Sequence, residues 1–80
     1  MSELVEELRR ASRLPAPPMR RAIRETAGAS QGQVADALHV DRVTVWRWEQ
    51  GRRTPRGELR DRYVMLLEEL RRMVDDDPAA

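Results

Sequence analysis

Proline and glycine residues divide this 80-residue chain into short segments. The strongest interruption is residues 14–18, Leu-Pro-Ala-Pro-Pro, because each proline fixes φ and pushes the preceding residue toward extended conformations. Between the interruptions, apolar residues recur three and four positions apart, which is the spacing of one face of a helix. The pattern therefore predicts an all-α fold of about five helices, one before residue 14 and four at residues 18–27, 31–38, 42–50 and 55–74.

Residues suited to helix starts stand at the expected boundaries. Ser30 and Asp41 are good N-cap residues for two short helices, and Thr54-Pro55 is expected to start the last helix as cap and first-turn proline. Pro18 is expected to be the first residue of the helix before them.

Length and composition favour one small domain. The chain has no Phe, one Tyr and two Trp, so aliphatic side chains must fill most of a thin core. The expected organisation is an N-terminal helical arm (1–14), a proline-rich linker (15–18), a main domain with a long last helix (19–74) and an acidic disordered tail (75–80).

The composition argues against several classes of function. Without Cys and with a single His, the chain lacks thiolate or His-cluster metal sites, and His39 has neither a nucleophile nor an orienting partner for catalysis. No apolar run reaches the ~18 residues of a membrane span, and the acidic N-terminus does not resemble a signal peptide. We expect a cytoplasmic, nucleoid-associated protein that is not an enzyme and uses no metal, cofactor, membrane or small-molecule ligand.

Charge is segregated along the chain. Residues 20–56 hold eight Arg against four acidic residues, whereas residues 57–80 hold four Arg against seven. All the basic residues are Arg, which binds phosphate and guanine in a bidentate way, although the codon usage of a GC-rich genome produces the same bias. The distribution therefore predicts that the middle of the chain attracts a polyanion and the C-terminal part does not.

Residues 31–50 fit a helix-turn-helix. The two short helices would be joined by a tight turn at residues 39–40, and Ala35 is the small residue that lets them approach. The second helix would present long polar side chains on one side, as entry into a DNA major groove ~12 Å wide requires. Apolar residues would fill the interface between the two helices, namely Val34, Leu38, Val40, Val45 and Trp48.

Three sequence motifs resemble the lambda-repressor-like, Cro/repressor (XRE) family of helix-turn-helix proteins. They are RETAGASQ at residues 24–31, VADALHV at residues 34–40 and TVWRWEQGRRTP at residues 44–55. The resemblance covers roughly residues 19–70 and leaves residues 1–14 outside. One departure is His39, which stands where the family usually has Gly, in a turn position expected to be left-handed.

The resemblance implies a role for individual residues. Base edges would be read by Arg42, Val43 and Arg47. DNA phosphates would be contacted by Gln31, Thr44, Gln50, Arg52 and Arg53, and Gln31 would also brace the first base-reading side chain. Arg24 and Glu49 would form a partly buried, structural ion pair.

Other residues keep two interpretations. Trp46 either packs on a sugar-phosphate edge of DNA or lies across neighbouring side chains, whereas Trp48 is expected in the core. Arg20 and Arg21 either contact DNA or form a solvated helix face. The cluster of Arg52, Arg53 and Arg56 in the loop after residue 50 is expected to contact phosphates.

Two apolar stripes are expected on the flanking helices. The inner face of the second helix would carry Met19, Ile23 and Ala27. The last helix has heptad spacing at Leu59, Tyr63, Leu66, Leu70 and Met73. Its second half is expected to form a homodimer seam through Leu66, Leu70 and Met73, because few apolar residues remain to cover it.

The favoured function is sequence-specific binding of double-stranded DNA by a homodimer, as a phage, prophage or plasmid type transcriptional regulator at an operator. The alternative is a DNA-recognition subunit of a larger assembly, such as an antitoxin, a recombination directionality factor or a packaging component, with a protein partner on the terminal helices. A third hypothesis is a protein-interaction module that keeps the fold without DNA binding.

Overall fold

The computed structural model describes residues 2–76, except for the side chains of residues 9–12. This part is all-α, as predicted, and contains no strand. Its helices are α1 (Glu3–Arg13), α2 (Pro17–Thr26), α3 (Gln31–Leu38), α4 (Arg42–Glu49) and α5 (Gly57–Asp75). The predicted disordered tail began at residue 75, but Asp75 is the last residue of α5. Residues 77–80 of that tail lie outside the described residues.

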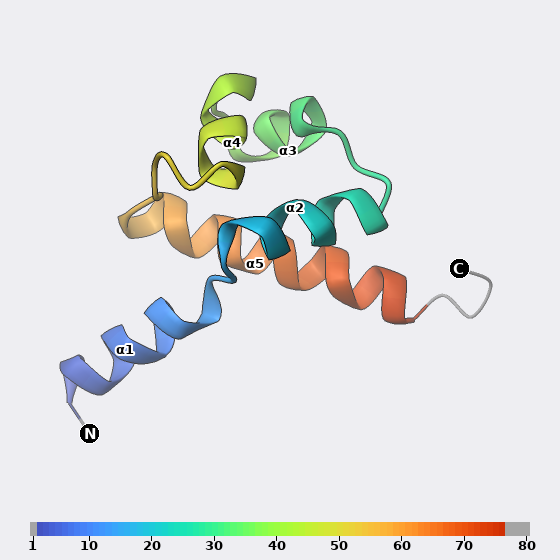
Figure 1. The fold of residues 1–80 in the computed structure, drawn as a ribbon. Helices are drawn as coiled ribbons and strands as arrows, with labels where there is room; N and C mark the ends of the chain where they lie inside the picture. Colours follow the sequence, from blue (N-terminus) through green and yellow to red (C-terminus); the bar gives the residue numbers. More distant parts are fainter. Residues whose placement is uncertain (1, 77–80) are drawn as a thin grey trace.

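Helices α2 to α5 pack into one body, and α1 projects from it (Figure 1). α3 packs against α4, and α2 packs against both α4 and α5. The long helix α5 runs along the side of the body opposite α3 and α4 (Figure 1). α1 leaves the body on the side of α5, so it points away from α4.

Proline determines where α1 ends and α2 begins. Leu14, the residue before Pro15, is extended with ψ of 114°, which stops α1 at Arg13. α2 begins at Pro17, so the expectation that Pro18 is its first residue was wrong by one position. Both prolines fit the first turn of a helix, where backbone N–H groups have no partner within the helix.

The predicted start of α5 at Thr54-Pro55 was also wrong. The helix begins at Gly57, and Arg56 before it is extended, with φ of −134° and ψ of 160°. Pro55 is buried, so it packs against the body instead of opening the helix. Gly57 has φ of +60°, a conformation that side chains disfavour, and this lets the extended loop turn into α5.

The buried face of α2 differs from the predicted one. Met19 is 46% exposed, whereas Arg20, Ile23 and Arg24 are buried. The helix is therefore rotated so that two arginines face the body. Each is buried because it finds hydrogen-bond acceptors on distant parts of the chain, and the apolar pattern of α2 alone does not reveal those acceptors.

The core lies between α2, α3, α4 and α5. Val45 and Tyr63 are its most completely buried large side chains, and the rings of Trp48 and Tyr63 pack with centroids 4.6 Å apart. The other members of the buried apolar cluster are Ile23, Val34, Ala35, Leu38, Trp48 and Leu67. Trp48 is thus a core residue.

The apolar stripe of α5 is wider than the heptad pattern. Val64 and Leu67 are buried in addition to Tyr63, because α2 and α3 both pack on α5 and together cover a broad arc. Leu59, Leu66 and Leu70 pack against the core from its edge, whereas Met73 is 53% exposed. Leu66, Leu70 and Met73 also line a hollow of about 280 Å³ beside the α2–α3 loop.

Candidate nucleic-acid interface

Local signals in the sequence set the start of α3 and the turn from α3 into α4. The Ser30 hydroxyl accepts a hydrogen bond from the Gln33 backbone N–H at 3.0 Å, and the Gln33 side chain accepts one from the Ser30 N–H at 2.8 Å, which caps α3. His39 then takes the expected left-handed conformation, with φ of 57° and ψ of 45°. Asp41 occupies the N-cap position of α4, but its side chain makes no capping hydrogen bond, so that part of the prediction was wrong.

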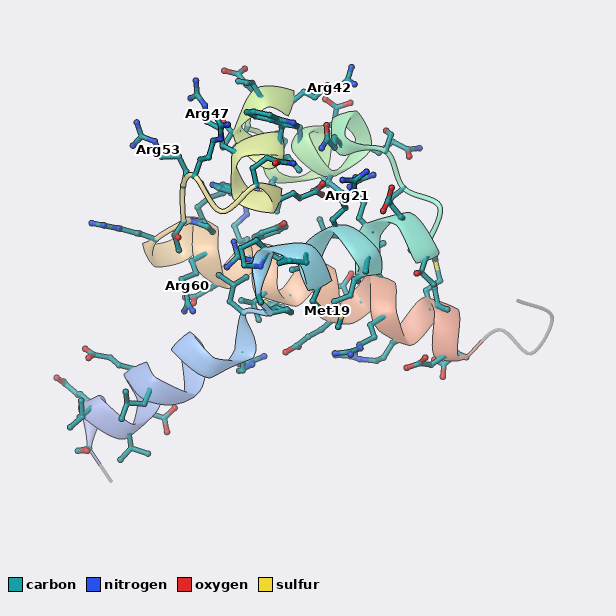
Figure 2. All side chains as sticks on the ribbon, in the orientation of Figure 1. Met19, Arg21, Arg42, Arg47, Arg53 and Arg60 are labelled. Carbon is teal, nitrogen blue, oxygen red and sulfur yellow. The ribbon has the colours of Figure 1, made fainter. Side chains whose placement is uncertain are left out.

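One side of α4 faces away from the body. Arg42, Arg47 and Gln50 are exposed, and Val43 is 48% exposed. Thr44 is half-buried at the edge of this side. Figure 2 shows Arg42 and Arg47 projecting outward from α4 with no part of the body beyond them. The three side chains that sequence analysis assigned to base reading, Arg42, Val43 and Arg47, are therefore all exposed on α4.

The opposite side of α4 is fastened by an ion pair. Arg24 Nε and Nη2 lie 2.6 Å and 2.9 Å from the Glu49 carboxylate oxygens, and Arg24 Nη1 donates to the Ala29 carbonyl at 2.9 Å. The Gln31 side-chain amide donates to Glu49 at 3.1 Å. The side chains of Arg24 and Glu49 are only 10% and 1% exposed. The network joins α2, α3 and α4 at the start of α3.

The charged forms of this pair stabilise each other. The hydrogen bond with Glu49 raises the pKa of Arg24 and outweighs the opposite effect of burial. Burial raises the pKa of Glu49, but the hydrogen bonds from Arg24 and Gln31 outweigh it, so the pKa lies below its usual value. Both residues therefore stay ionised at neutral pH, and the Gln31 side chain is held at the N-terminus of α3.

A basic hollow of about 350 Å³ lies on one side of α4. Arg21 and Arg42 place guanidinium groups at it from α2 and α4, and Gln31 and Gln50 add side-chain amides. Trp46, which is 37% exposed, forms part of the wall. The donors at this hollow suit a phosphate group, and the N-terminus of α3 contributes a favourable dipole.

A second basic hollow, of about 720 Å³, lies on the other side of α4. Four arginines line it from α4 and the following loop, namely Arg47, Arg52, Arg53 and Arg56. Arg52 also lies over the Trp46 ring, with its guanidinium carbon 5.2 Å from the ring centroid. Trp46 therefore does lie across a neighbouring side chain, and it holds a basic group beside α4.

Two neighbouring arginines of α2 have different roles. Arg20 is buried and donates to the Pro15 carbonyl at 2.7 Å and to the Trp48 carbonyl at 3.0 Å, and burial lowers its pKa. Arg21 is exposed, pairs with Glu25 at 3.3 Å and lines the smaller hollow. Arg20 is thus a structural residue, whereas Arg21 belongs to the basic surface.

Within residues 2–76, no group of three or more His, Cys, Asp or Glu residues could hold a metal ion. None of the helices in this part of the chain is long and apolar enough to cross a membrane. The basic surface around α4 is the site that the sequence and structure both single out.

Comparison with known proteins identifies the domain that carries this basic surface. A family model described as a helix-turn-helix domain matches residues 21–75, which is more than half of the chain. The match includes α3, α4 and both basic hollows, and it excludes α1. No curated protein and no solved structure matches the chain significantly.

Proposed function

The chain belongs to the helix-turn-helix domain family, and from that membership we propose that it is a sequence-specific regulator of transcription that inserts α4 into the major groove of an operator. Its class would be that of phage, prophage or plasmid regulators, which act by blocking access to a promoter. In this role, Arg42 and Arg47 read guanine edges and Val43 contacts a thymine methyl group.

The observation that carries the proposal is the position of two basic hollows on opposite sides of α4. Of the proposed base-reading residues, Arg42 lies at one hollow and Arg47 at the other, and Val43 is exposed on the same helix. A helix in the major groove has a phosphate backbone on either side of it, so phosphate donors are needed on both sides. Gln31 and Gln50 would bind one backbone, with Trp46 in the wall of their hollow, and Thr44, Arg52 and Arg53 would bind the other.

A selection of bound sequences from random duplex DNA tests the proposal. The selected duplex should bind at least ~10³-fold more tightly than a scrambled duplex of the same length at ~150 mM salt, as expected of a specific DNA-binding protein. Fluorescence anisotropy provides the affinities. Equal binding of the selected and scrambled duplexes would show that the protein does not read sequence.

We also propose that the regulator binds as a homodimer through Leu66, Leu70 and Met73 of α5. Two recognition helices would then lie about one DNA turn (~34 Å) apart, and the selected site should be a palindrome with that spacing. The exposed part of the seam, Met73, allows a test that does not disturb the core. Met73→Glu should give a folded monomer in sedimentation experiments, and a variant that remains a dimer would exclude this seam.

A further inference from the structure

Arg52 is the first residue after the glycine that ends α4, and local backbone geometry sets its position. Gly51 has φ of +74°, the left-handed conformation that commonly closes the end of a helix. The Arg52 backbone N–H then donates to the Arg47 carbonyl at 2.9 Å. This turn keeps the start of the loop close to the last turns of α4, where Trp46 lies.

The Arg52 side chain rests on an aromatic ring and not on an acid. Its guanidinium carbon lies 5.2 Å from the centroid of the Trp46 ring, within the ~6 Å range of a cation–π contact. Within residues 2–76, the same side chain makes no hydrogen bond and no ion pair. An acid would neutralise the guanidinium group and accept its N–H groups, whereas a ring leaves the charge in place. Arg52 is thus held beside α4 while its charge stays available to an anion.

Arg53, the next residue, differs from Arg52 in this one respect. Both arginines are exposed and line the larger basic hollow, and Figure 2 shows Arg53 projecting outward from the loop after α4. Among the described residues, no aromatic ring lies against Arg53. A long side chain loses conformational freedom when it binds a phosphate, and this loss weakens the binding. The ring has already removed part of that freedom from Arg52, but not from Arg53.

We propose that Trp46 strengthens DNA binding through Arg52, as a positioning residue that does not itself contact the DNA. This role rests on the proposed docking of α4, in which the larger hollow receives one phosphate backbone. The Trp46 ring holds the Arg52 guanidinium at that hollow before DNA arrives, so Arg52 binds a phosphate with a smaller loss of conformational freedom.

A double-mutant cycle on DNA affinity, measured by fluorescence anisotropy, tests this role. Trp46→Leu keeps an apolar side chain but removes the ring, so it should weaken binding about 2- to 5-fold, as expected for an exposed cation–π contact. Arg52→Ala should weaken binding further than that, because it removes the phosphate contact itself. In the Arg52→Ala background, Trp46→Leu should cause no additional loss. Trp46→Phe retains a ring and should recover part of the affinity.

Arg53→Ala is the matched control. It removes a neighbouring arginine that has no ring against it, so its effect and that of Trp46→Leu should add. Coupling of Trp46 to Arg53 that is as strong as the coupling to Arg52 would indicate a general disturbance of the loop, and the proposal would be wrong. Urea denaturation should give the wild-type free energy of unfolding for each single variant, because all three side chains are exposed.

Two further outcomes of the cycle would overturn the proposal. If Trp46→Leu weakened binding equally with and without Arg52, Trp46 would contact the DNA directly. If Trp46→Leu left the affinity of the otherwise wild-type protein unchanged, the ring would have no role in DNA binding.

Fluorescence provides a second measurement that needs no DNA. Trp46 is 37% exposed and Trp48, the other tryptophan, only 2%, so acrylamide quenching of tryptophan fluorescence reports mainly on Trp46. Arg52→Ala uncovers the Trp46 ring and should increase the quenching, whereas Arg53→Ala should not. Equal quenching in the two variants would show that Arg52 does not occupy the ring in solution, and this too would overturn the proposal.

The cycle can fail or succeed independently of operator binding. A phosphate contact carries no sequence information, so the coupling between Trp46 and Arg52 should be the same on a scrambled duplex at ~50 mM salt, where non-specific binding is strong. Loss of sequence preference in the wild type would refute operator binding and leave this coupling intact. Additive effects of Trp46→Leu and Arg52→Ala would refute the role of Trp46 and leave operator binding intact.

Discussion

The charged residues on the two sides of α4 differ in burial and in pairing. On the inward side, Glu49 is 5% exposed and is held by Arg24 and Gln31. On the outward side, Arg42 and Arg47 are exposed and have no hydrogen bond or ion pair within residues 2–76. A charge that is buried and paired joins helices, whereas an exposed, unpaired charge remains available to a polyanion.

Because of this difference, one side of α4 should contribute to the stability of the fold and the other to DNA binding. Substitutions on the inward side should lower the free energy of unfolding, because they leave buried polar groups without partners. Substitutions on the outward side should lower DNA affinity and leave the free energy of unfolding unchanged.

Glu49→Ala should destabilise the fold by about 3–5 kcal/mol, because it leaves the Arg24 guanidinium buried without its counter-charge. It also removes the acceptor of the Gln31 side-chain amide. Urea denaturation followed by circular dichroism gives the free energy of unfolding. A loss below about 1 kcal/mol, the size expected of an exposed pair, would contradict the inward role of Glu49.

The matched control replaces both partners. A double variant with Arg24→Met and Glu49→Leu removes both charges at once, and it should recover much of the lost stability, because apolar residues can replace a buried pair at little cost. Acid gives a second check. The pKa of Glu49 is lowered in the fold, so its contribution is complete above pH about 4.5 and is lost as the pH falls through the lowered pKa.

Arg47→Ala should weaken binding of the selected duplex by about 1–3 kcal/mol and relax discrimination at one base pair, because it removes a base-edge contact. Urea denaturation should give the wild-type free energy of unfolding, since Arg47 is exposed. Anisotropy on the selected duplex and on its single-base variants gives the affinities. Equal losses on selected and random duplexes would remove Arg47 from the base-reading set.

Tyr63→Phe should stabilise the fold by about 1 kcal/mol. The Tyr63 hydroxyl is buried and has no hydrogen-bond partner within the described part of the chain, so its removal relieves a desolvation cost and keeps the ring against Trp48. Urea denaturation measures the gain. A loss of more than about 1 kcal/mol would show that the hydroxyl makes a stabilising interaction.

Alkaline titration checks the same hydroxyl. Burial raises the pKa of Tyr63 to about 12, above the usual value of 10.0. Stability should therefore be complete below pH about 10 and fall as the pH rises toward 12, and Tyr63→Phe should lack this decrease. The chain has a single Tyr, so the ultraviolet absorbance of tyrosinate reports this group alone.

Much of the α3–α4 region could be predicted because its signals are local. Ser30 caps α3 through a residue three positions away, and His39 adopts its left-handed conformation within the turn itself. The bounds of α3 were predicted correctly, and those of α4 to within one residue, from such signals. The periodicity of α4 also separated inward Trp48 from outward Arg47.

The rest depends on partners that are distant in the sequence. Arg20 is buried because the Trp48 carbonyl, 28 residues away, accepts its hydrogen bond. α5 begins at Gly57 and not at the predicted Pro55, because Pro55 is buried against the body. The C-terminal end of α1 is joined to α5 by an ion pair between Arg13 and Glu68, 55 residues apart. A helix pattern that is analysed one segment at a time contains no information about such long-range contacts.

Arg53→Ala should have the smallest effect, a roughly few-fold loss of affinity on every duplex, because a phosphate contact carries no sequence information. The slope of log affinity against log salt should fall by about one, and the free energy of unfolding should not change. Arg71→Ala is the matched control, an exposed arginine near the far end of α5 that should leave the slope unchanged. If Arg53→Ala weakened only the selected duplex, the loop would read bases, and base reading would extend beyond the outward side of α4.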